Sequence, residues 1–434
     1  LSRYSHSLKK QIQHNKKCYM IDLALIRTIG FRVSEDKGRL LENLVFLLIG
    51  VCALCAVSSG FKGLNFFEQP ADEIIYLRYC DYINHGGLGS YGLLFKEYVQ
   101  NSQLQLFPNP LRVGFFILGA CFSRIFGSGF VSLAYLSLFS YCIFLASCFY
   151  FARKYFSAKT SLLFLLLLAF SPIQMAMARR ALIESTSTLF VTLSLWLFLD
   201  LVLRKKSPLR YLVFVLIYGF AILVKETACL LTVLFLAILL LQKFLFKKEI
   251  SPADILCVSV FPFALVGLVY LALGGFPYIG DMFRIMATLS KTVPYALLFN
   301  SGPWFRYIID YLILSPWVTL LSIGFIFSLL ASKETRPIEF YLALTLILIF
   351  FLFDLFAKNV RYAMILDIPM RLLSVLMLER IFSQRFVRWA SLLAAACVFM
   401  IASFDYATFY NLFLKQGIYD PVSLMLFKAT RLIP

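Results

Sequence analysis

Charged residues are scarce in this sequence, and histidine is almost absent from it. Of the 434 residues, 15% are charged, 61% are hydrophobic and three are histidine. A water-soluble domain of this length could not cover its surface with so few charged side chains. The composition therefore predicts an integral membrane protein, and the shortage of histidine argues against a metal site built on that residue.

The ten cysteines lie mostly inside apolar runs, with few histidines near them. That placement indicates neither a zinc site nor a disulfide framework. The formal net charge of +18 does not predict nucleic-acid binding either. An excess of Lys and Arg in a multi-pass membrane protein mostly records its topology.

Long uncharged runs predict an all-α fold with about eleven transmembrane helices. The segment 111–126 is short and carries Arg112 and Arg124 near its ends, so we interpret it as a helix lying in the membrane interface. The eleven predicted spans are, approximately, 44–59, 130–151, 160–178, 185–203, 208–224, 227–242, 253–276, 311–332, 338–357, 362–381 and 389–404.

Basic residues between these spans predict the orientation. With the N-terminus in the cytoplasm, five basic clusters fall on the cytoplasmic side, as the positive-inside bias requires. The clusters are Arg153, Lys154 and Lys159; Arg204, Lys205, Lys206 and Arg210; Lys243, Lys247 and Lys248; Lys333 and Arg336; and Arg380, Arg385 and Arg388.

The same topology divides the chain into three predicted parts. A basic cytoplasmic tail occupies 1–43, a transmembrane domain occupies 44–404, and a short outer tail occupies 405–434. Two long outer loops are expected within the domain, at 60–129 and 277–310. Charged residues at the outer helix ends would then converge on one face of the membrane.

Three carboxylates on that outer face are candidates for chemistry. Asp72 and Glu73 lie in the first outer loop, and Glu184 lies at the outer end of a span. One reading of the pair is a solvated loop, and one reading of Glu184 is a neutralising partner of Arg179 or Arg180. The functional alternative is a general base, Asp72, with Glu73 supporting it and Glu184 over the same cavity.

Six basic residues depart from the positive-inside tendency. One reading is that each reaches into the lipid headgroups. If they gather around one cavity, they would instead bind an anion. The paired N–H donors of an arginine guanidinium fit two oxygens of a phosphate. Asp367 and Arg371 lie within a predicted span at i, i+4, which favours a structural pair. The six outer residues are Arg179, Arg180, Lys225, Arg306, Lys358 and Arg361.

Several segments, taken in order, carry a family resemblance. They are "ADEIIY" at 71–76, "NPLRVGFFILGACFSRIFG" at 109–127, "SPIQMAMARRALIES" at 171–185, "YGFAILVKET" at 218–227, "GPWFRYIIDYLILSPW" at 302–317 and "KNVRYAMILDIP" at 358–369. The chain resembles the polyprenyl-phosphate-sugar-dependent membrane glycosyltransferases of the GT-C fold, nearest to the protein O-mannosyltransferase and lipid A aminoarabinose transferase group.

The resemblance implies an inverting sugar transfer from a polyprenyl phosphate to a hydroxyl acceptor. Asp72 would act on the acceptor, and Glu184 would shape the same pocket, at a position where the family usually has Asp. Lys225, Lys358 and Arg361 would hold the lipid phosphate, with Tyr362 beside them in the Arg-Tyr motif. No cofactor is obligatory in this reading; a divalent metal is possible but not indicated.

The expected partners are a polyprenyl-phosphate-linked sugar, a hydroxyl acceptor on a glycan, lipid or protein, and membrane lipids. The expected location is a bacterial inner membrane rather than the endoplasmic reticulum, with the active site on the outer face. Two other classes remain open at this stage. One is a transporter or flippase for a lipid-linked anion, and the other is a catalytically silent subunit of a membrane assembly.

Overall fold

The computed structural model describes residues 38–59, 72–204, 206–292, 297, 301–331, 336–355 and 358–418. The chain divides into two compact units, Leu1–Val51 and Cys52–Pro434. In the first unit the described residues, 38–51, are helical. Everything that follows concerns the second unit, whose described residues form helices and no β-strand.

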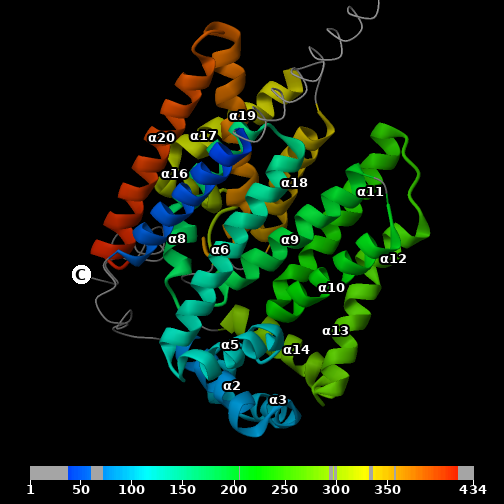
Figure 1. Ribbon diagram of the computed structural model, residues 1–434. Helices are drawn as coiled ribbons and strands as arrows, with labels where there is room; N and C mark the ends of the chain where they lie inside the picture. The colour runs from blue at the N-terminus through cyan, green and yellow to red at the C-terminus, as the bar shows by residue number, and fades with distance from the viewer. Residues whose placement is uncertain are drawn as a thin grey trace, which may run out of the picture. The chain divides into compact units, whose positions relative to one another are not determined.

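The α-helices of this unit are shown in Figure 1. In chain order they are α2 (Asp72–Gly86), α3 (Tyr91–Gln100), α4 (Ser102–Gln105), α5 (Val113–Phe126), α6 (Phe130–Tyr155), α7 (Ala158–Ala169), α8 (Pro172–Ala178), α9 (Glu184–Leu203), α10 (Pro208–Val224), α11 (Leu231–Phe246), α12 (Pro252–Ser259), α13 (Phe261–Ala272), α14 (Ile279–Thr292), α16 (Arg306–Leu314), α17 (Pro316–Ala331), α18 (Pro337–Asp354), α19 (Asp367–Arg385) and α20 (Ala390–Phe409). Short 3-10 turns include η2 (Glu226–Leu230) and η4 (Met364–Leu366).

Seven helices within the described residues are long and apolar enough to cross a membrane, or eight if a bent pair counts as one span. The predicted multi-pass, all-α membrane architecture is therefore confirmed, while the number eleven stays a prediction. The remaining predicted spans are also helical, but α10 and α17 are short and α19 contains Asp367 and Arg371. The seven are Gly38–Ser58, Phe130–Tyr155, Glu184–Leu203, Glu226–Phe246, Pro252–Ala272, Pro337–Asp354 and Ala390–Lys415.

Two spans differ in shape from the sequence prediction. The run predicted as 160–178 is broken into α7 and α8, which are bent by 61°. Ser171 caps the second helix and Pro172 opens it, so the backbone hydrogen bonding restarts there. The last helix continues past the predicted end at 404, through a π-helical turn at Tyr410–Lys415, because Asp405 is paired inside the protein rather than placed in water.

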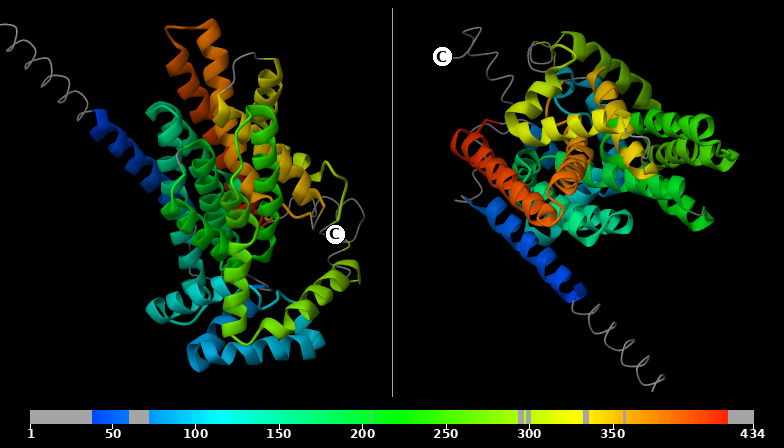
Figure 2. Two further views of the ribbon diagram at one scale, coloured as in Figure 1. Left: turned by 90° about the vertical axis from the view of Figure 1, so that its right-hand side faces the viewer. Right: turned by 90° about the horizontal axis from the view of Figure 1, so that it is seen from above.

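The segment predicted to lie in the interface is helical, as α5, and its place in the interface stays a prediction. Its 14 residues cover about 21 Å, less than the roughly 30 Å of a hydrocarbon core. It packs against α2, α6 and α10. Gly114 makes the contact with α10 possible, since a side chain there would meet the backbone of Leu223 and Val224 at 3.0 Å. Figures 1 and 2 show α2, α3 and α5 together at one end of the long helices.

Candidate active site

The paired carboxylates of the first predicted outer loop begin helix α2. Acidic side chains in a first helical turn are stabilised by the positive end of the helix dipole. Glu73 is 1% exposed and forms an ion pair with Arg180, which precedes α9. Asp72 is half-buried, and about 100° of helical rotation separates it from its neighbour. Glu73 thus anchors the start of α2, and Asp72 points elsewhere.

A buried acid–base pair lies where α9 begins and α10 ends. Lys225 Nζ is 3.6 Å from Glu184 Oε1, and both side chains are at most 6% exposed. The same ammonium lies 4.4 Å from the centre of the Tyr362 ring. Burial lowers the pKa of Lys225 from its ordinary value; Glu184 opposes this shift, and Arg112 adds to it. An anion entering beside Lys225 would stabilise its charged form.

Tyr362 is under the electrostatic influence of both this pair and Asp72. Burial raises the pKa of the Tyr362 phenol to about 12, with Arg361 opposing the shift and the charges of Asp72 and Glu184 adding to it. Burial also raises the pKa of Tyr76, one turn along α2 from Asp72, and there Arg112 opposes while Asp72 and Glu184 add. The carboxylates of Asp72 and Glu184 therefore act on the same two phenols.

Arg361 enters the site from the segment between α18 and η4. Its backbone N–H and its Nε both donate to Asn359 Oδ1, at 3.1 and 3.4 Å. Its guanidinium carbon lies 6.0 Å from the Tyr362 ring centre. A tight turn at Asn359 therefore sets the direction of the Arg361 side chain.

A cavity of about 30 Å³ lies among these side chains. That is room for roughly one water molecule, so a phosphate or a sugar fits only after the lining side chains move. Its polar lining consists of Glu184, Ser187, Thr188, Lys225, Thr227, Arg361 and Tyr362.

An arginine that was not among the predicted site residues braces the cluster. Arg112 donates from Nε and Nη2 to the two carboxylate oxygens of Glu226, at 3.0 and 2.9 Å, and from Nη1 to the Tyr76 hydroxyl at 2.7 Å. This two-point contact joins α5 to the residue that follows Lys225. Nothing in the sequence links Arg112 with Glu226, because 114 positions separate them.

Two of the predicted phosphate-binding arginines are engaged with other parts of the protein. Arg179 Nη1 donates to the Ser59 carbonyl at 2.7 Å, and its guanidinium carbon lies 5.8 Å from the Phe409 ring centre. Arg180 pairs with Glu73. Neither lines the cavity next to Lys225. Their predicted role in substrate binding stays a prediction.

The two remaining basic residues predicted to bind substrate, Arg306 and Lys358, also have partners within the protein. Arg306 Nη1 donates to the Ser301 carbonyl at 2.5 Å, and its Nε is 3.9 Å from Asp310 Oδ2. Lys358 Nζ lies 3.0 Å from Asp354 Oδ1 and donates to the Gly302 carbonyl at 2.7 Å. The cavity is lined by Arg361 from this segment and not by Lys358.

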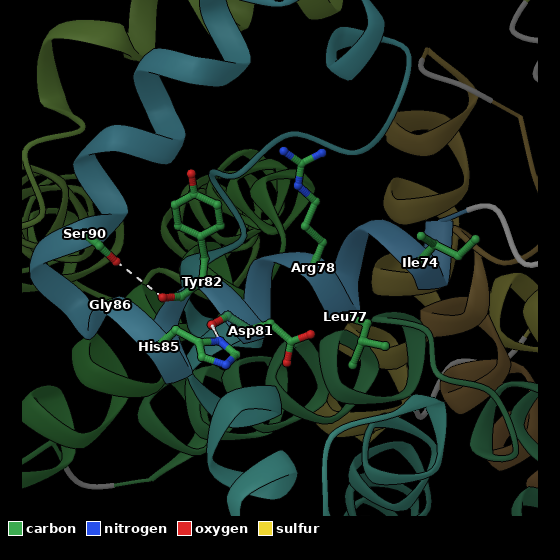
Figure 3. Close-up of a pocket in the computed structure, with 8 residues that line it drawn as sticks. All are labelled: Ile74, Leu77, Arg78, Asp81, Tyr82, His85, Gly86 and Ser90. Carbon is green, nitrogen blue, oxygen red and sulfur yellow. Dashed lines mark hydrogen bonds between the residues drawn. The ribbon is translucent and has the colours of Figure 1, made fainter.

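A second, larger hollow lies on the exposed face of α2 (Figure 3). Its volume is about 470 Å³, and its lining includes Arg78, Asp81, Tyr82 and His85. Asp81 follows Asp72 by nine residues, which places it half a helical turn away from Asp72. This hollow is therefore separate from the cluster around Tyr362.

No group of three or more His, Cys, Asp or Glu side chains is arranged to hold a metal ion within the part of the chain that the structure describes. The charged groups of the cluster are instead arranged as pairs of opposite sign. Arg112 with Glu226 and Lys225 with Glu184 are the two pairs.

Fold and site together define a multi-pass membrane protein with an acid- and base-lined pocket at one end of its helices. Residues 110–270 match a family model described as "Dolichyl-phosphate-mannose-protein mannosyltransferase". That range contains Arg112, Glu184, Lys225 and Glu226 of the cluster. No curated protein matches the chain in sequence.

Solved structures of ArnT from Cupriavidus metallidurans are similar in fold. The one described as bound to undecaprenyl phosphate has a TM-score of 0.50 at 16% identity and covers 79% of this chain and 61% of its own. For the apo state the TM-score is 0.39 at 14% identity, with 69% of this chain and 57% of the ArnT chain covered. The present chain thus spans about three fifths of the length of ArnT. The predicted resemblance and the predicted GT-C fold are confirmed.

Proposed function

We propose that this protein transfers a sugar from a polyprenyl phosphate to a hydroxyl acceptor. The observation that carries the proposal is that Glu184, Lys225 and Arg361 line one cavity with Tyr362. Asp72 does not line this cavity, but its charge acts on the same phenol. Carboxylates suit activation of a hydroxyl, and buried cations suit a departing phosphate. The family match over residues 110–270 and the ArnT-like fold support the same reaction class.

In the proposed step the acceptor oxygen attacks C1 of the sugar. The bond between C1 and the phosphate oxygen breaks, and its electron pair leaves with the polyprenyl phosphate. Asp72 takes the proton of the acceptor hydroxyl. Lys225 and Arg361 stabilise the charge that develops on the phosphate, and Glu184 holds Lys225 in place. Attack opposite the leaving group inverts the anomeric centre.

The roles of the remaining predicted residues follow from their contacts. Glu73 would fix the start of α2 through Arg180. Arg179, Arg306 and Lys358 would act at longer range, by adding positive charge around the donor phosphate. Because protein side chains supply that charge and phosphate is a fair leaving group, we propose that transfer requires no bound metal.

The direct test is transfer of a labelled sugar from a polyprenyl-phosphate donor by the purified full chain, with and without a chelator. Transfer in the presence of the chelator is the expected result. If the protein binds the donor but transfers the sugar to none of the glycan, lipid or protein acceptors offered, the result favours a catalytically silent subunit. If the donor instead crosses the bilayer of a sealed vesicle unchanged, the chain is a flippase.

The flippase reading rests on charges at mid-membrane, which transporters use for binding. Asp367 and Arg371 are such charges, but they are paired with each other and with Asp405 at 2.6–2.7 Å. The contacts pair these charges inside the protein, although Asp367 Oδ2 and Asp405 Oδ1 accept no hydrogen bond from the residues that the structure describes. The structure thus favours the structural reading of this pair over a transport site.

We further propose a bacterial inner membrane, with the N-terminus in the cytoplasm and the cluster on the outer face. In a cysteine-free background, a Cys at the exposed position Ser102, near α2 and α3, is expected to be labelled only from outside. A Cys at Gln384, near the end of α19, is expected to be labelled only from the cytoplasm. Membrane-impermeant thiol labelling of sealed vesicles measures both. Labelling of both from one side contradicts the arrangement.

Replacing Arg361 by Ala is expected to weaken donor binding by about 10- to 100-fold, since a charge-assisted contact to phosphate is worth on the order of 1.5–3 kcal/mol. Arg361→Lys should restore little of it, because the planar fork is lost. Equilibrium binding of a non-transferable polyprenyl-phosphate analogue measures the effect. Lys243→Gln, on the exposed end of α11, is the matched charge control. Unchanged affinity in Arg361→Ala would remove this residue from the site.

A further inference from the structure

Another polar cavity lies at the end of the helices away from the candidate site. Its volume is about 850 Å³. Glu184 of the candidate site begins α9, whereas Asp200 near the other end of α9 pairs with Lys154, two residues before Phe156 in the lining of this cavity. The 16 positions from Glu184 to Asp200 along α9 separate the two places by about 24 Å. The charged lining of the cavity is Lys159, Arg336, Glu339, Glu379 and Arg380.

The elements that form this cavity are α7, α17, α18 and α19. Figure 1 shows α17, α18 and α19 far from α2, α3 and α5. The helices α7 and α18 both begin at the cavity, with Ser157 capping α7. Helix beginnings carry partial positive charge, but the C-terminal parts of α17 and α19, which carry partial negative charge, also line this cavity, so its attraction for an anion depends on the side chains.

The basic side chains of the cavity contact other parts of the protein, but these contacts do not occupy all of their N–H donors. Arg380 donates to Ser328 Oγ at 2.7 Å and lies 4.9 Å from the Phe325 ring centre, while its distance to Glu339 Oε2 is 3.7 Å. The Arg336–Glu339 contact is also 3.7 Å. Ion pairs at that distance are longer than a hydrogen bond, and arginine has five N–H donors. Donors therefore remain for an added oxygen ligand.

Lys159 shows the same pattern. Its Nζ is 3.7 Å from Glu379 Oε1 and donates to Ser391 Oγ at 2.9 Å. The Glu379 carboxylate also accepts from the Thr160 hydroxyl, at 3.0 and 3.1 Å. Three basic and two acidic side chains thus line the cavity and leave one net positive charge.

The lining is also divided between polar and apolar parts. Phe156, Phe325 and Leu376 are buried aromatic or aliphatic side chains, whereas the charged groups belong to helix ends. Beside it, α17 exposes Phe327 and Leu330, at 66% and 80%. A ligand that fits has a charged group at the helix ends and an apolar part along the helices.

We propose that this cavity binds the headgroup of an anionic phospholipid with one phosphodiester charge and free headgroup hydroxyls. The phosphate lies against Arg380, Lys159 and Arg336, and its single charge balances the net charge of the lining. Glu339 and Glu379 accept hydrogen bonds from the headgroup hydroxyls. Basic pockets between membrane helices are suited to such headgroups. The site takes no part in sugar transfer, so lipid binding there is a function additional to the one proposed above.

The test uses the full chain in nanodiscs of phosphatidylcholine, with phosphatidylglycerol added as the probe. Lipid retained after mild delipidation is measured by native mass spectrometry, and the midpoint of thermal unfolding is measured in parallel. Wild-type protein is expected to retain phosphatidylglycerol and to unfold at a higher temperature with it. Lys159→Gln and Arg380→Gln should each lower retention about fivefold, in line with about 1 kcal/mol for one basic residue.

Lys243→Gln is the control, because it removes a basic charge from the exposed end of α11 without touching the cavity. It should retain lipid as the wild type does. If Arg380→Gln fails to fold, the half-exposed Lys159 still decides the question. Equal retention by wild type and Lys159→Gln, or equal retention of phosphatidylcholine and phosphatidylglycerol, overturns the proposal. The same rise in unfolding temperature from inorganic phosphate, without phosphatidylglycerol, overturns the assignment to a lipid.

Discussion

Replacing Asp72 by Asn is expected to lower turnover by about 10²- to 10⁴-fold and to leave donor binding in place. The amide keeps the shape of the side chain but cannot accept the proton of the acceptor hydroxyl, and loss of a positioned base has that effect. Single-turnover transfer with the purified variant measures the rate, and binding of a non-transferable donor analogue measures affinity. A fall in rate without a fall in affinity is the signature of a group that acts in the transition state.

The chain offers matched controls on the same helix. Asp81 lies on the opposite, exposed face of α2, so Asp81→Asn should transfer sugar at the wild-type rate. Glu73→Gln should cost less turnover than Asp72→Asn, because Glu73 points to Arg180, although it should lower stability. Wild-type transfer by Asp72→Asn would show that another group is the base, even if the protein proves to be a glycosyltransferase.

Replacing Arg371 by Leu is expected to destabilise the protein by about 3–5 kcal/mol. Arg371 is 1% exposed and bonds Asp367 at 2.7 Å, Asp405 at 2.6 Å, Ser315 Oγ at 2.9 Å and the Leu167 carbonyl at 2.7 Å. Its removal leaves two carboxylates buried without their shared cation, and breaking a buried pair on one side costs that amount. The loss is measured as the free energy of unfolding in detergent or bicelles.

Replacing all three charged residues separates the effect of losing the arginine from the effect of leaving carboxylates buried without it. Leu at Asp367, Arg371 and Asp405 together removes the three charges of this network, so most of the stability should return. If the Arg371→Leu variant is as stable as the wild type, the structural role assigned to this network is wrong. That result would also revive the transport reading, since intramembrane charges without a structural role are typical of ion pathways.

The fold was predictable from sequence as far as composition controls it. Long apolar runs specify helices because backbone groups in a membrane must bond within their own segment. The break at Ser171–Pro172 was missed because the span was predicted from its lack of charge, although a Ser-Pro pair inside the run is a sequence signal for a new helix start. The end of α20 was also set too early, since a charge such as Asp405 ends a span only when it has no partner in the protein.

Charge placement in the sequence was enough to propose site residues but not to establish them. Asp72, Glu184, Lys225 and Arg361 were proposed because they lie at or near predicted outer helix ends, and their roles stay a prediction. Their neighbours Arg179 and Lys358 share that position, yet their side chains turn to Ser59 and Asp354. Residue type at a helix end does not give the direction of the side chain.

Long-range partners were out of reach for a different reason. In the sequence, Arg112 marked only one end of a short helix. Its hydrogen bond to Glu226 depends on how closely α5 approaches α10 at Gly114. No local pattern in the sequence encodes that approach. It follows from the packing of helices that are far apart in the chain.

The small cavity around Lys225 implies a particular kinetic behaviour. With room for roughly one water, the cavity is too small for a phosphate group, so if Lys225 receives the donor phosphate as proposed, only an opened conformation admits it. The observed affinity is then the affinity of the open conformation multiplied by its population. Substitutions that loosen the Arg112–Glu226 brace would raise that population, so a variant with weaker internal contacts can bind its donor more tightly and react more slowly.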